Sequence, residues 1–578
     1  MPLSERLLKY IAEHQLLSEE QIERLREEHH ASGRSVRELI SESELLSEEQ
    51  LLEALAAVSR LPIIHLYEQQ IPADVRQLVR GDLLRTHTVI PFGYDPEEPE
   101  ILLVAMDDPM NRRGRDIVSI SSKCRVRPYL ATTTDILVAI DRYYGSDEMR
   151  EAAEMYTRDS ENSLSVEEEL IREDVNSSPV VMLVNSLIEQ AARQRASDIH
   201  IEPEREGVRV RYRVDGVLFV ASSYDRRLLS AIIARVKILS GLDISEKRKP
   251  QDGRSTIMVD GREYDIRVST LPTVYGEKCV MRLALKQAVH AKFGMHTLGF
   301  NAAEEAHFRR ILSRPNGIVL VTGPTGSGKS RTLYTALNEL NSIDVNIVTV
   351  EDPVEVNIDG VNQTQVNPKA GLTFADSLRS ILRQDPDIIM IGEIRDGETA
   401  SIAVQASITG HLVLSTLHTN DTVSSITRLL DMGVESYLIA DSLVGIVAKR
   451  LVRCLCPHCK RPHQLEEHEI QFLGLTPEEA KTATVYEPVG CQRCGGRGYF
   501  ERTGVYEILE VSHRVRDLIA SRAPTAEIRD VAVEEGMSTL HSSARRLVLE
   551  GETTISEMMR ISVEGQDDQH GHAEERLK

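Results

Sequence analysis

The feature that most constrains this chain is a glycine-rich turn inside the stretch Gly317–Leu340. An apolar run over residues 318–321 precedes the turn and predicts a buried strand. After the turn, apolar residues recur at helical spacing from Leu333 onward, which predicts a helix. The turn itself, GPTGSGKS, fits the pattern G-x-x-x-x-G-K-[ST] between a strand and a helix. The sequence therefore predicts a P-loop in an α/β sheet.

This turn predicts a nucleotide site with ATP and Mg²⁺ as its ligands. Backbone N–H groups of a P-loop close around phosphates at a helix N-terminus. Lys329 has the reach for the β and γ phosphates, and the Ser330 hydroxyl is a ligand for Mg²⁺. The nucleotide-binding residues are expected to be Gly323, Pro324, Thr325, Gly326, Ser327, Gly328, Lys329 and Ser330.

Length and charge limit the other possibilities. A chain of 578 residues is too long for one core, and about three or four domains are expected. The net charge of −22 argues against a nucleic-acid partner, because neutralising phosphates needs a clustered basic surface. No apolar run approaches about 18 residues, and no charged-then-apolar leader follows Met1. We expect a cytosolic protein that is at most peripheral to a membrane.

A repeat marks the N-terminal region. The segment Leu16–Ile22 recurs as Leu45–Leu51, at an offset of 29 residues. Ser18 and Ser47 each precede an apolar helical run, with a glutamine three residues later, so both are predicted N-caps with capping boxes. Residues 1–60 are therefore expected to form two helical hairpins.

The remaining chain divides by composition and periodicity. Residues 146–177 are predicted to be an acidic linker, with an exposed helix as the alternative. The other expected parts are a small α+β domain at 61–145, a second α+β domain at 178–290, a core with a parallel sheet at 300–450, a cysteine-rich insert at 451–505, a helical region at 506–563 and a polar tail at 564–578.

Polar residues follow three further predicted strands. Glu351 and Asp352 come after the apolar run at 345–350, and His418 lies just past the run at 412–415. After the run at 388–391 a glycine stands where an aspartate usually follows, so Glu393 must supply the carboxylate. The C-terminal ends of parallel strands bind ligands, and phosphoryl transfer needs a group that orients water. These residues are therefore candidate catalytic groups.

Two C-x-x-C pairs predict a metal site. Cys456 and Cys459 are separated from Cys491 and Cys494 by 31 residues. Four thiolates at tetrahedral reach are the pattern of structural zinc, so Zn²⁺ is the expected ligand. Free or transiently oxidised thiols are the alternative, and the nearby Cys454 and His458 are not excluded as ligands.

The four stretches GPTGSGKS, EDPVE, IGEIRD and GHLVLSTLHTN resemble the Walker A, Asp box, Walker B and His box of the secretion ATPase superfamily. These are the motors of type II secretion and type IV pili. The resemblance runs from about residue 178 to 563. It implies an α/β multidomain fold, in which a PAS-like domain precedes a RecA-like P-loop ATPase core, assembled as a homohexamer. It also implies hydrolytic roles for Glu351 and Glu393, and a γ-phosphate sensor at His418.

The domain before the core resembles the family through ASDIHIEP and VRYRVDG. Within it Arg267 and Arg282 match arginines that reach the nucleotide in the family, so both are candidate catalytic residues. The alternative is that both arginines pair with surface acids.

The tetracysteine insert resembles those of the type II secretion E component and the pilus-assembly ATPase. We expect a cytoplasmic hexameric ATPase that powers pseudopilus assembly and contacts the inner membrane only through platform proteins. A type IV pilus-assembly motor is the alternative within the family. Another alternative is a second-messenger-binding regulatory scaffold without turnover, but the intact Lys329, Glu351 and Glu393 argue against it. The net charge argues against a third alternative, a motor stimulated by nucleic acid.

The N-terminal repeat resembles the tandem cyclic-di-GMP-binding motif of some superfamily members, with departures at its glycine positions. Leu8 and Gln15 occupy these positions in the first copy, and Arg37 and Glu44 in the second. A side chain there blocks close approach of a ligand to the backbone. We expect a docking module for a membrane-anchored partner that does not bind the dinucleotide.

Overall fold

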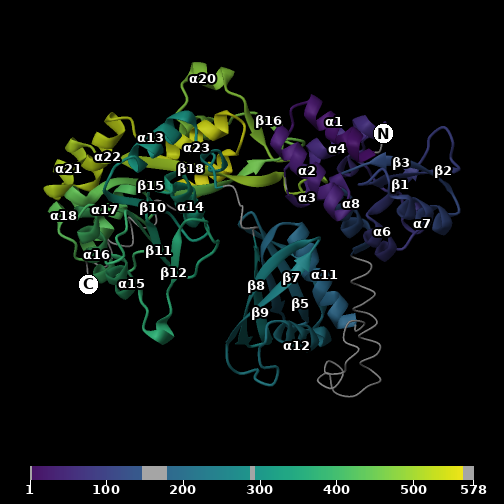
Figure 1. Cartoon of the computed structure of the whole chain (residues 1–578), viewed down its shortest axis with the longest axis horizontal. Coiled ribbons are helices and arrows are strands. Elements are labelled where there is room, and N and C mark those ends of the chain that lie inside the picture. Colours follow the sequence, from purple (N-terminus) through teal and green to yellow (C-terminus); the bar gives the residue numbers. More distant parts are fainter. Residues whose placement is uncertain (1–2, 44, 146–178, 287–292, 564–578) are drawn as a thin grey trace. The chain divides into compact units, whose positions relative to one another are not determined.

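The computed structural model describes residues 3–43, 45–145, 179–286 and 293–563 (Figure 1). The chain divides into two compact units, Met1–Lys286 and Gln287–Lys578. The expected linker at 146–177 and the expected tail at 564–578 lie outside the described residues.

The N-terminal repeat forms four helices, in which α1 packs mainly against α4 and α2 mainly against α3. Their bounds are Leu3–Glu13 (α1), Glu19–Ser32 (α2), Val36–Ser43 (α3) and Glu48–Ser59 (α4). Ser18 caps α2 and Ser47 caps α4, each in a capping box with the glutamine three residues later. The repeated sequence LLSEEQ therefore encodes the same helix start twice.

A small α+β region follows, as predicted. Strands Val89–Tyr94 (β1), Ile101–Met106 (β2) and Arg125–Leu130 (β3) form one sheet in the order β1-β2-β3. The helices of this region are Ala73–Arg76 (α5), Gly81–His87 (α6), Arg112–Ser122 (α7) and Thr133–Ile140 (α8). Residues of both regions, such as Ile11, Ile40 and Val104, belong to one continuous hydrophobic core. The repeat and the α+β region therefore share a core.

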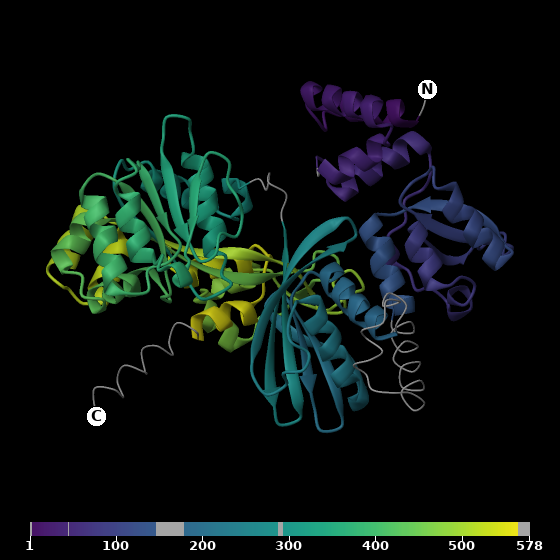
Figure 2. The same cartoon turned by 60° about the horizontal axis from the view of Figure 1, so that its bottom comes forward.

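The second α+β domain contains a six-stranded antiparallel sheet in the order β6-β5-β4-β9-β8-β7. Helices Pro179–Arg193 (α11) and Leu229–Leu239 (α12) share its hydrophobic core (Figure 2). Alternation of buried and exposed residues along β5 leaves its arginines on the outer face. The strands are Ala196–Pro203 (β4), Gly207–Val214 (β5), Val217–Asp225 (β6), Gln251–Val259 (β7), Arg262–Thr273 (β8) and Gly276–Leu285 (β9).

The second unit is built on a seven-stranded sheet in the order β12-β11-β13-β14-β10-β15-β18 (Figure 1). Alternate residues of β10 enter two different cores, Ile318 with α15–α18 and Val319 with α13 and α14, so helices cover both faces. The strands are Gly317–Thr322 (β10), Ile347–Glu351 (β11), Asn362–Gln365 (β12), Ile388–Ile391 (β13), Leu412–Leu417 (β14), Leu443–Leu455 (β15) and Tyr499–Glu510 (β18). The covering helices are Ala302–Leu312 (α13), Lys329–Leu340 (α14), Phe374–Ile381 (α15), Gly397–Ile408 (α16), Thr422–Asp431 (α17) and Ser436–Ser442 (α18).

The sheet differs from the expected parallel one at its edge. β15 continues to Leu455 and pairs antiparallel with β18, from Gly445 opposite Glu510 to Leu455 opposite Tyr499. β15 runs past residue 450 and β18 begins before residue 506, so both strands cross the expected limits of the insert at 451–505. The sequence analysis ended the core too early because charged and cysteine residues interrupt the apolar run of β15. Between them lie Arg461–His463 (β16), Glu467–Leu473 (α19), Pro477–Thr482 (α20) and Val485–Glu487 (β17). The chain then forms the predicted helical region, with His513–Ala520 (α21), Thr525–Glu534 (α22), Leu540–Leu549 (α23) and Ile555–Val563 (α24).

Candidate functional site

The glycine-rich turn joins β10 to α14, as the sequence predicts. Gly326 and Gly328 have φ of 80° and 82°, which favours glycine at both positions. A Cβ on Gly323 would lie 2.3 Å from the main-chain oxygen of Lys449 on β15. The loop conformation therefore depends on these glycines and on its contact with β15. Its exposed residues 324–326 leave the α14 N-terminus accessible to an anion.

Lys329 lies at the first turn of α14 and folds back over the loop. Its Nζ donates to the main-chain oxygens of Gly323 at 2.8 Å and Pro324 at 3.1 Å. Burial lowers the pKa of Lys329 to about 8, although Glu393 opposes this shift. The ammonium is therefore held at the P-loop within the field of the Glu393 carboxylate.

Strand register brings the candidate catalytic residues to one edge of the sheet. Thr322 at the end of β10 pairs with Leu417 at the end of β14. Ile391 at the end of β13 pairs with Val350 on one side and Ser415 on the other. β11 ends at Glu351, and Glu393 and His418 lie just past the ends of β13 and β14. These three residues therefore line the edge of the sheet where the P-loop begins. His411, which precedes β14, lies at the opposite end and contacts the Ala406 main-chain oxygen at 2.8 Å.

Glu393 is paired with Arg395 and His418. His418 Nε2 lies 3.3 Å from Glu393 Oε2, and Arg395 makes a close ion pair with Oε1. Burial raises the pKa of Glu393, but the hydrogen bonds and charges of Arg395 and His418 together outweigh it, and the pKa lies below its usual value. Glu393 is therefore an anion at neutral pH, with 16% of its side chain exposed.

Glu351 has a different environment, because it is 4% exposed and its oxygens accept hydrogen bonds from three donors. Thr349 Oγ1 and Gln363 Nε2 donate to Oε1 at 2.8 and 2.9 Å. The hydroxyl of Tyr334, on the P-loop helix, donates to Oε2. Burial and Glu351 together raise the pKa of Tyr334 well above its usual value. Glu351 thus joins β11, β12 and α14, a role that the sequence did not indicate.

The loop after β14 is fixed to its neighbours by residues that sequence reasoning missed. Thr322 Oγ1 donates to the Thr419 main-chain oxygen at 2.9 Å, next to His418. Arg450, 3% exposed on β15, donates to Asn420 Oδ1 at 2.6 Å. The signal available in the sequence was the charged pair Lys449-Arg450, which directly follows an apolar run.

Arg267 and Arg282 lie opposite each other on β8 and β9, and Arg254 of β7 lies opposite Arg267. Both arginines also lie near acidic residues, as in the alternative interpretation. Arg282 Nε donates to Asp198 at 3.1 Å, and Arg267 Nε lies 3.6 Å from Asp265. Like charges directly opposite each other are unfavourable in a sheet. A row of three arginines therefore fits a surface that meets an anion, and Arg254 is a member that the sequence analysis missed.

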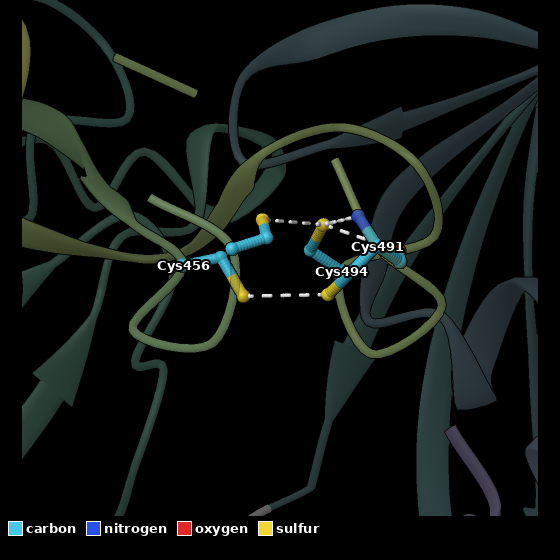
Figure 3. A group of neighbouring side chains, drawn as sticks. Cys456, Cys491 and Cys494 are labelled. Atoms are coloured by element: carbon cyan, nitrogen blue, oxygen red, sulfur yellow. Dashed lines mark hydrogen bonds between the residues drawn. The ribbon is translucent and has the colours of Figure 1, made fainter. Parts of the chain in front are cut away.

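The four predicted metal ligands come together in the insert. The Sγ atoms of Cys456, Cys459, Cys491 and Cys494 all lie within 4.8 Å of one another. Figure 3 shows Cys456 facing Cys491, with their sulfurs 3.8 Å apart, and Cys459 and Cys494 are also 3.8 Å apart. Sulfurs around a tetrahedral Zn²⁺ at about 2.3 Å are themselves about 3.8 Å apart. Cys454 and His458 are not part of this group.

The surroundings of Cys459 and Cys494 shift the pKa values of their thiols in opposite directions. Burial raises the pKa of Cys459 to about 12. Burial also raises that of Cys494, but main-chain N–H groups of Cys491 and Gly498, each 3.1 Å from its sulfur, bring the pKa below its usual value. Clustered thiolates in such a site need a metal ion to offset their charge.

The family is decided by a comparison with known protein families. The model of the type II/IV secretion system protein family matches residues 173–560, which is more than half of the chain. The chain belongs to this family. A second model, that of the MshEN domain, matches residues 59–150.

Relatives in the type II/IV secretion system protein family carry names from two systems. The type IV pilus assembly ATPase PilB of Myxococcus xanthus is 41% identical over 565 residues, covering 96% of this chain and 99% of the relative. The type II secretion system protein E of Xanthomonas campestris is 40% identical over 566 residues, covering 96% and 98%. The type II secretion system ATPase E of Vibrio cholerae is 46% identical over 435 residues, covering 72% and 83%.

The family, together with the six-stranded and seven-stranded sheets and their covering helices, confirms the expected α/β multidomain architecture of a secretion ATPase. Within the residues that the structure describes, no helix has the length and apolarity needed to cross a membrane.

Proposed function

We propose that this chain is a cytoplasmic hexameric ATPase that powers pseudopilus assembly and protein export by a type II secretion system. That it is an ATP hydrolase follows from its family, in which two of the relatives above are named ATPases. The observation that carries the catalytic assignment is the Glu393–His418 pair at the same sheet edge as Lys329.

The proposed chemistry assigns one task to each group at this edge. Lys329 and the loop N–H groups bind the phosphates, and Ser330 supplies a hydroxyl ligand for Mg²⁺. Mg²⁺ neutralises charge on the phosphates when it is bound. Glu393, an anion with partial exposure, orients the attacking water and accepts its proton. His418 holds the Glu393 carboxylate in place and adds a donor toward the γ-phosphate. Glu351, already saturated with donors, positions α14 against β11.

The test of turnover is phosphate release from ATP by the purified chain, with and without DNA. We expect hydrolysis that DNA does not stimulate, and loss of nucleotide binding in Lys329→Ala. A chain that binds ATP tightly without hydrolysing it would instead support the regulatory scaffold.

The choice of type II secretion is supported by relatives named type II secretion system protein E, which reach 48% identity over 398 residues. Pilus assembly is the second candidate, because the 41% identical PilB matches 96% of this chain. Deletion of the gene in its own organism separates the two. Loss of extracellular proteins with normal pili supports type II secretion, and loss of pili with normal secretion overturns it.

Hexamer formation and platform binding are further parts of the proposal. The arginine row at Arg254, Arg267 and Arg282 supports a nucleotide contact made by the second α+β domain as subunits assemble. We propose that inner-membrane platform proteins provide the membrane contact. Sedimentation with and without nucleotide measures assembly, and a chain that hydrolyses ATP at full rate as a monomer would contradict it.

We also propose Zn²⁺ as the ligand of Cys456, Cys459, Cys491 and Cys494. The sulfur spacing and the N–H donors at Cys494 support it. Elemental analysis should find one zinc per chain in protein purified without chelators, and well under one would reject the site.

The N-terminal repeat is proposed to dock a membrane-anchored partner without binding cyclic-di-GMP. Leu8 is buried in the core, and Arg37 is occupied by Asp107 at 2.5 Å and by Thr133. Glu44 lies outside the described residues. Calorimetry of the full chain with cyclic-di-GMP tests this, and micromolar or tighter binding would overturn it.

A further inference from the structure

Lys449 is a buried lysine beneath the P-loop that the proposed catalytic scheme does not use. It follows Ala448, which pairs with Thr322 at the end of β10. Its side chain is 3% exposed, and its Nζ donates to Thr332 Oγ1 at 3.1 Å and to the Gly328 main-chain oxygen at 3.3 Å. Lys449 therefore contacts the N-cap and the first turn of α14 from below.

No carboxylate balances this ammonium. Among the described residues, none of the ion pairs includes Lys449, and its nearest aromatic contact is the Tyr506 ring, with Nζ 5.3 Å from the centroid. Burial and the charge of Arg331 lower the pKa of Lys449 to about 7. The charged and titratable groups next to these contacts in sequence or strand register are Lys329 and Arg331 on α14, Arg450 on β15, and Tyr506 and Glu507 on β18. Glu304 on α13 lies within electrostatic reach of Tyr506.

The two carboxylates in this set are used elsewhere. Glu507 accepts hydrogen bonds from Thr422 at the start of α17, on the other face of the sheet. Glu304 is paired with Arg546 at 3.3 Å. Lys449 thus places a positive charge at the positive end of the α14 dipole, which is unfavourable for the free protein. An apolar side chain of similar length would fill the same space without this cost.

We propose that Lys449 is a second lysine of the nucleotide site, a positioning residue whose ammonium supports the P-loop turn and meets the charge of bound phosphates. The proposal rests on nucleotide binding at the P-loop, as assigned above. Phosphates on the other side of this turn favour the charged lysine, so the cost present in the free protein is relieved in the complex. Lys449 acts through Gly328 and Thr332, and it touches no reacting atom.

A pH dependence follows from this arrangement. Because the complex favours the charged form, nucleotide binding raises the pKa of Lys449 and takes up protons. The contribution of Lys449 to affinity is full below about pH 7 and declines as the pH rises above that value. Lys329, with a pKa of about 8, adds a separate decline at higher pH.

The test is calorimetric titration of Mg²⁺ and ADP into the full chain and its Lys449→Met variant, at pH 6.5 and 8.5. If phosphates raise the lysine pKa by about one unit, the variant should bind about five- to tenfold more weakly at pH 6.5 and within about twofold at pH 8.5. Without nucleotide, the variant should melt no lower than wild type, because methionine removes an unpaired buried charge. The exposed Lys481→Met is the matched control and should bind as wild type does.

A merely structural lysine gives a different pattern. A variant with lowered melting temperature and a pH-independent change in affinity, or with unchanged affinity at both pH values, would overturn the proposal. Titrating ADP into wild type in two buffers of different ionisation enthalpy measures the protons taken up on binding and needs no variant. Absence of proton uptake near pH 7.5 would also overturn the proposal. Failure of wild type to bind ADP at all would instead reject the proposed function.

Discussion

Replacing Glu393 by glutamine separates binding from hydrolysis at the proposed site. Glutamine keeps the shape and can still accept from Arg395, so the edge of the sheet should retain its geometry. It removes the anion that the proposed scheme uses to orient and deprotonate water. General-base groups contribute about 10²–10⁴ in rate, which corresponds to about 3–5 kcal/mol of activation free energy. We expect kcat for phosphate release to fall by that factor in Glu393→Gln.

Nucleotide affinity should move in the opposite direction. The Glu393 charge is felt by Lys329, whose pKa it raises, and the same negative charge repels phosphates. Its removal should therefore leave ADP binding unchanged or make it tighter. Glu398→Gln, an exposed glutamate on α16 paired with Arg379, makes the same chemical change nearby and should preserve kcat.

Phosphate release and ADP titration on the three proteins decide between the assignments. If Glu393→Gln hydrolyses ATP at the wild-type rate, Glu393 is not the catalytic carboxylate. If the variant loses both binding and melting temperature, its effect is structural and the division of roles between Glu393 and Glu351 is wrong. A Glu351→Gln variant that keeps its fold and kcat would support a positioning role for Glu351.

Other variants test the neighbouring contacts. Tyr334→Phe removes a donor to the buried Glu351 and should lower the free energy of unfolding by about 1.5–3 kcal/mol in denaturant titration; an unchanged midpoint would contradict this. Glu557→Ala leaves Arg453 without its buried partner at 2.8 Å and should lower the free energy of unfolding by about 3 kcal/mol in the same assay. In wild type, the stabilisation from Glu557 should be lost only as the pH falls below the usual glutamate range, because Arg453 outweighs burial and lowers the pKa of Glu557. Mixing Arg267→Ala with Lys329→Ala chains should recover some hydrolysis if the arginine acts across subunits; no recovery after confirmed mixing argues against it.

Local patterns were sufficient to predict much of this fold. The capping boxes at Ser18 and Ser47 and the P-loop between β10 and α14 are contained in short segments, and the structure has them where the sequence indicates. The convergence of Glu351, Glu393 and His418 was also predictable, because parallel strands align their C-terminal ends.

Contacts between distant segments were not predictable in this way. The burial of Glu351 depends on Tyr334 and Gln363, which lie on other elements. The arginine row at Arg254, Arg267 and Arg282 depends on strand register, which a single sequence does not specify. These side chains acquire their partners only when the sheet is assembled.

Strand β15 explains why the insert limits were misplaced, and it also links two sites of the second unit. Lys449 contacts the P-loop turn and Arg450 the loop after His418, from opposite faces of the strand. Further along, Arg453 is held by Glu557 of α24, and the strand ends at Leu455, next to Cys456, one of the proposed zinc ligands. The first half of β15, up to Ala448, pairs with both β10 and β18, and the rest of the strand stays paired with β18 as far as Leu455. The cysteine cluster is therefore continuous with the strand that supports the P-loop turn, and the Zn²⁺ proposed above would fix the far end of that strand.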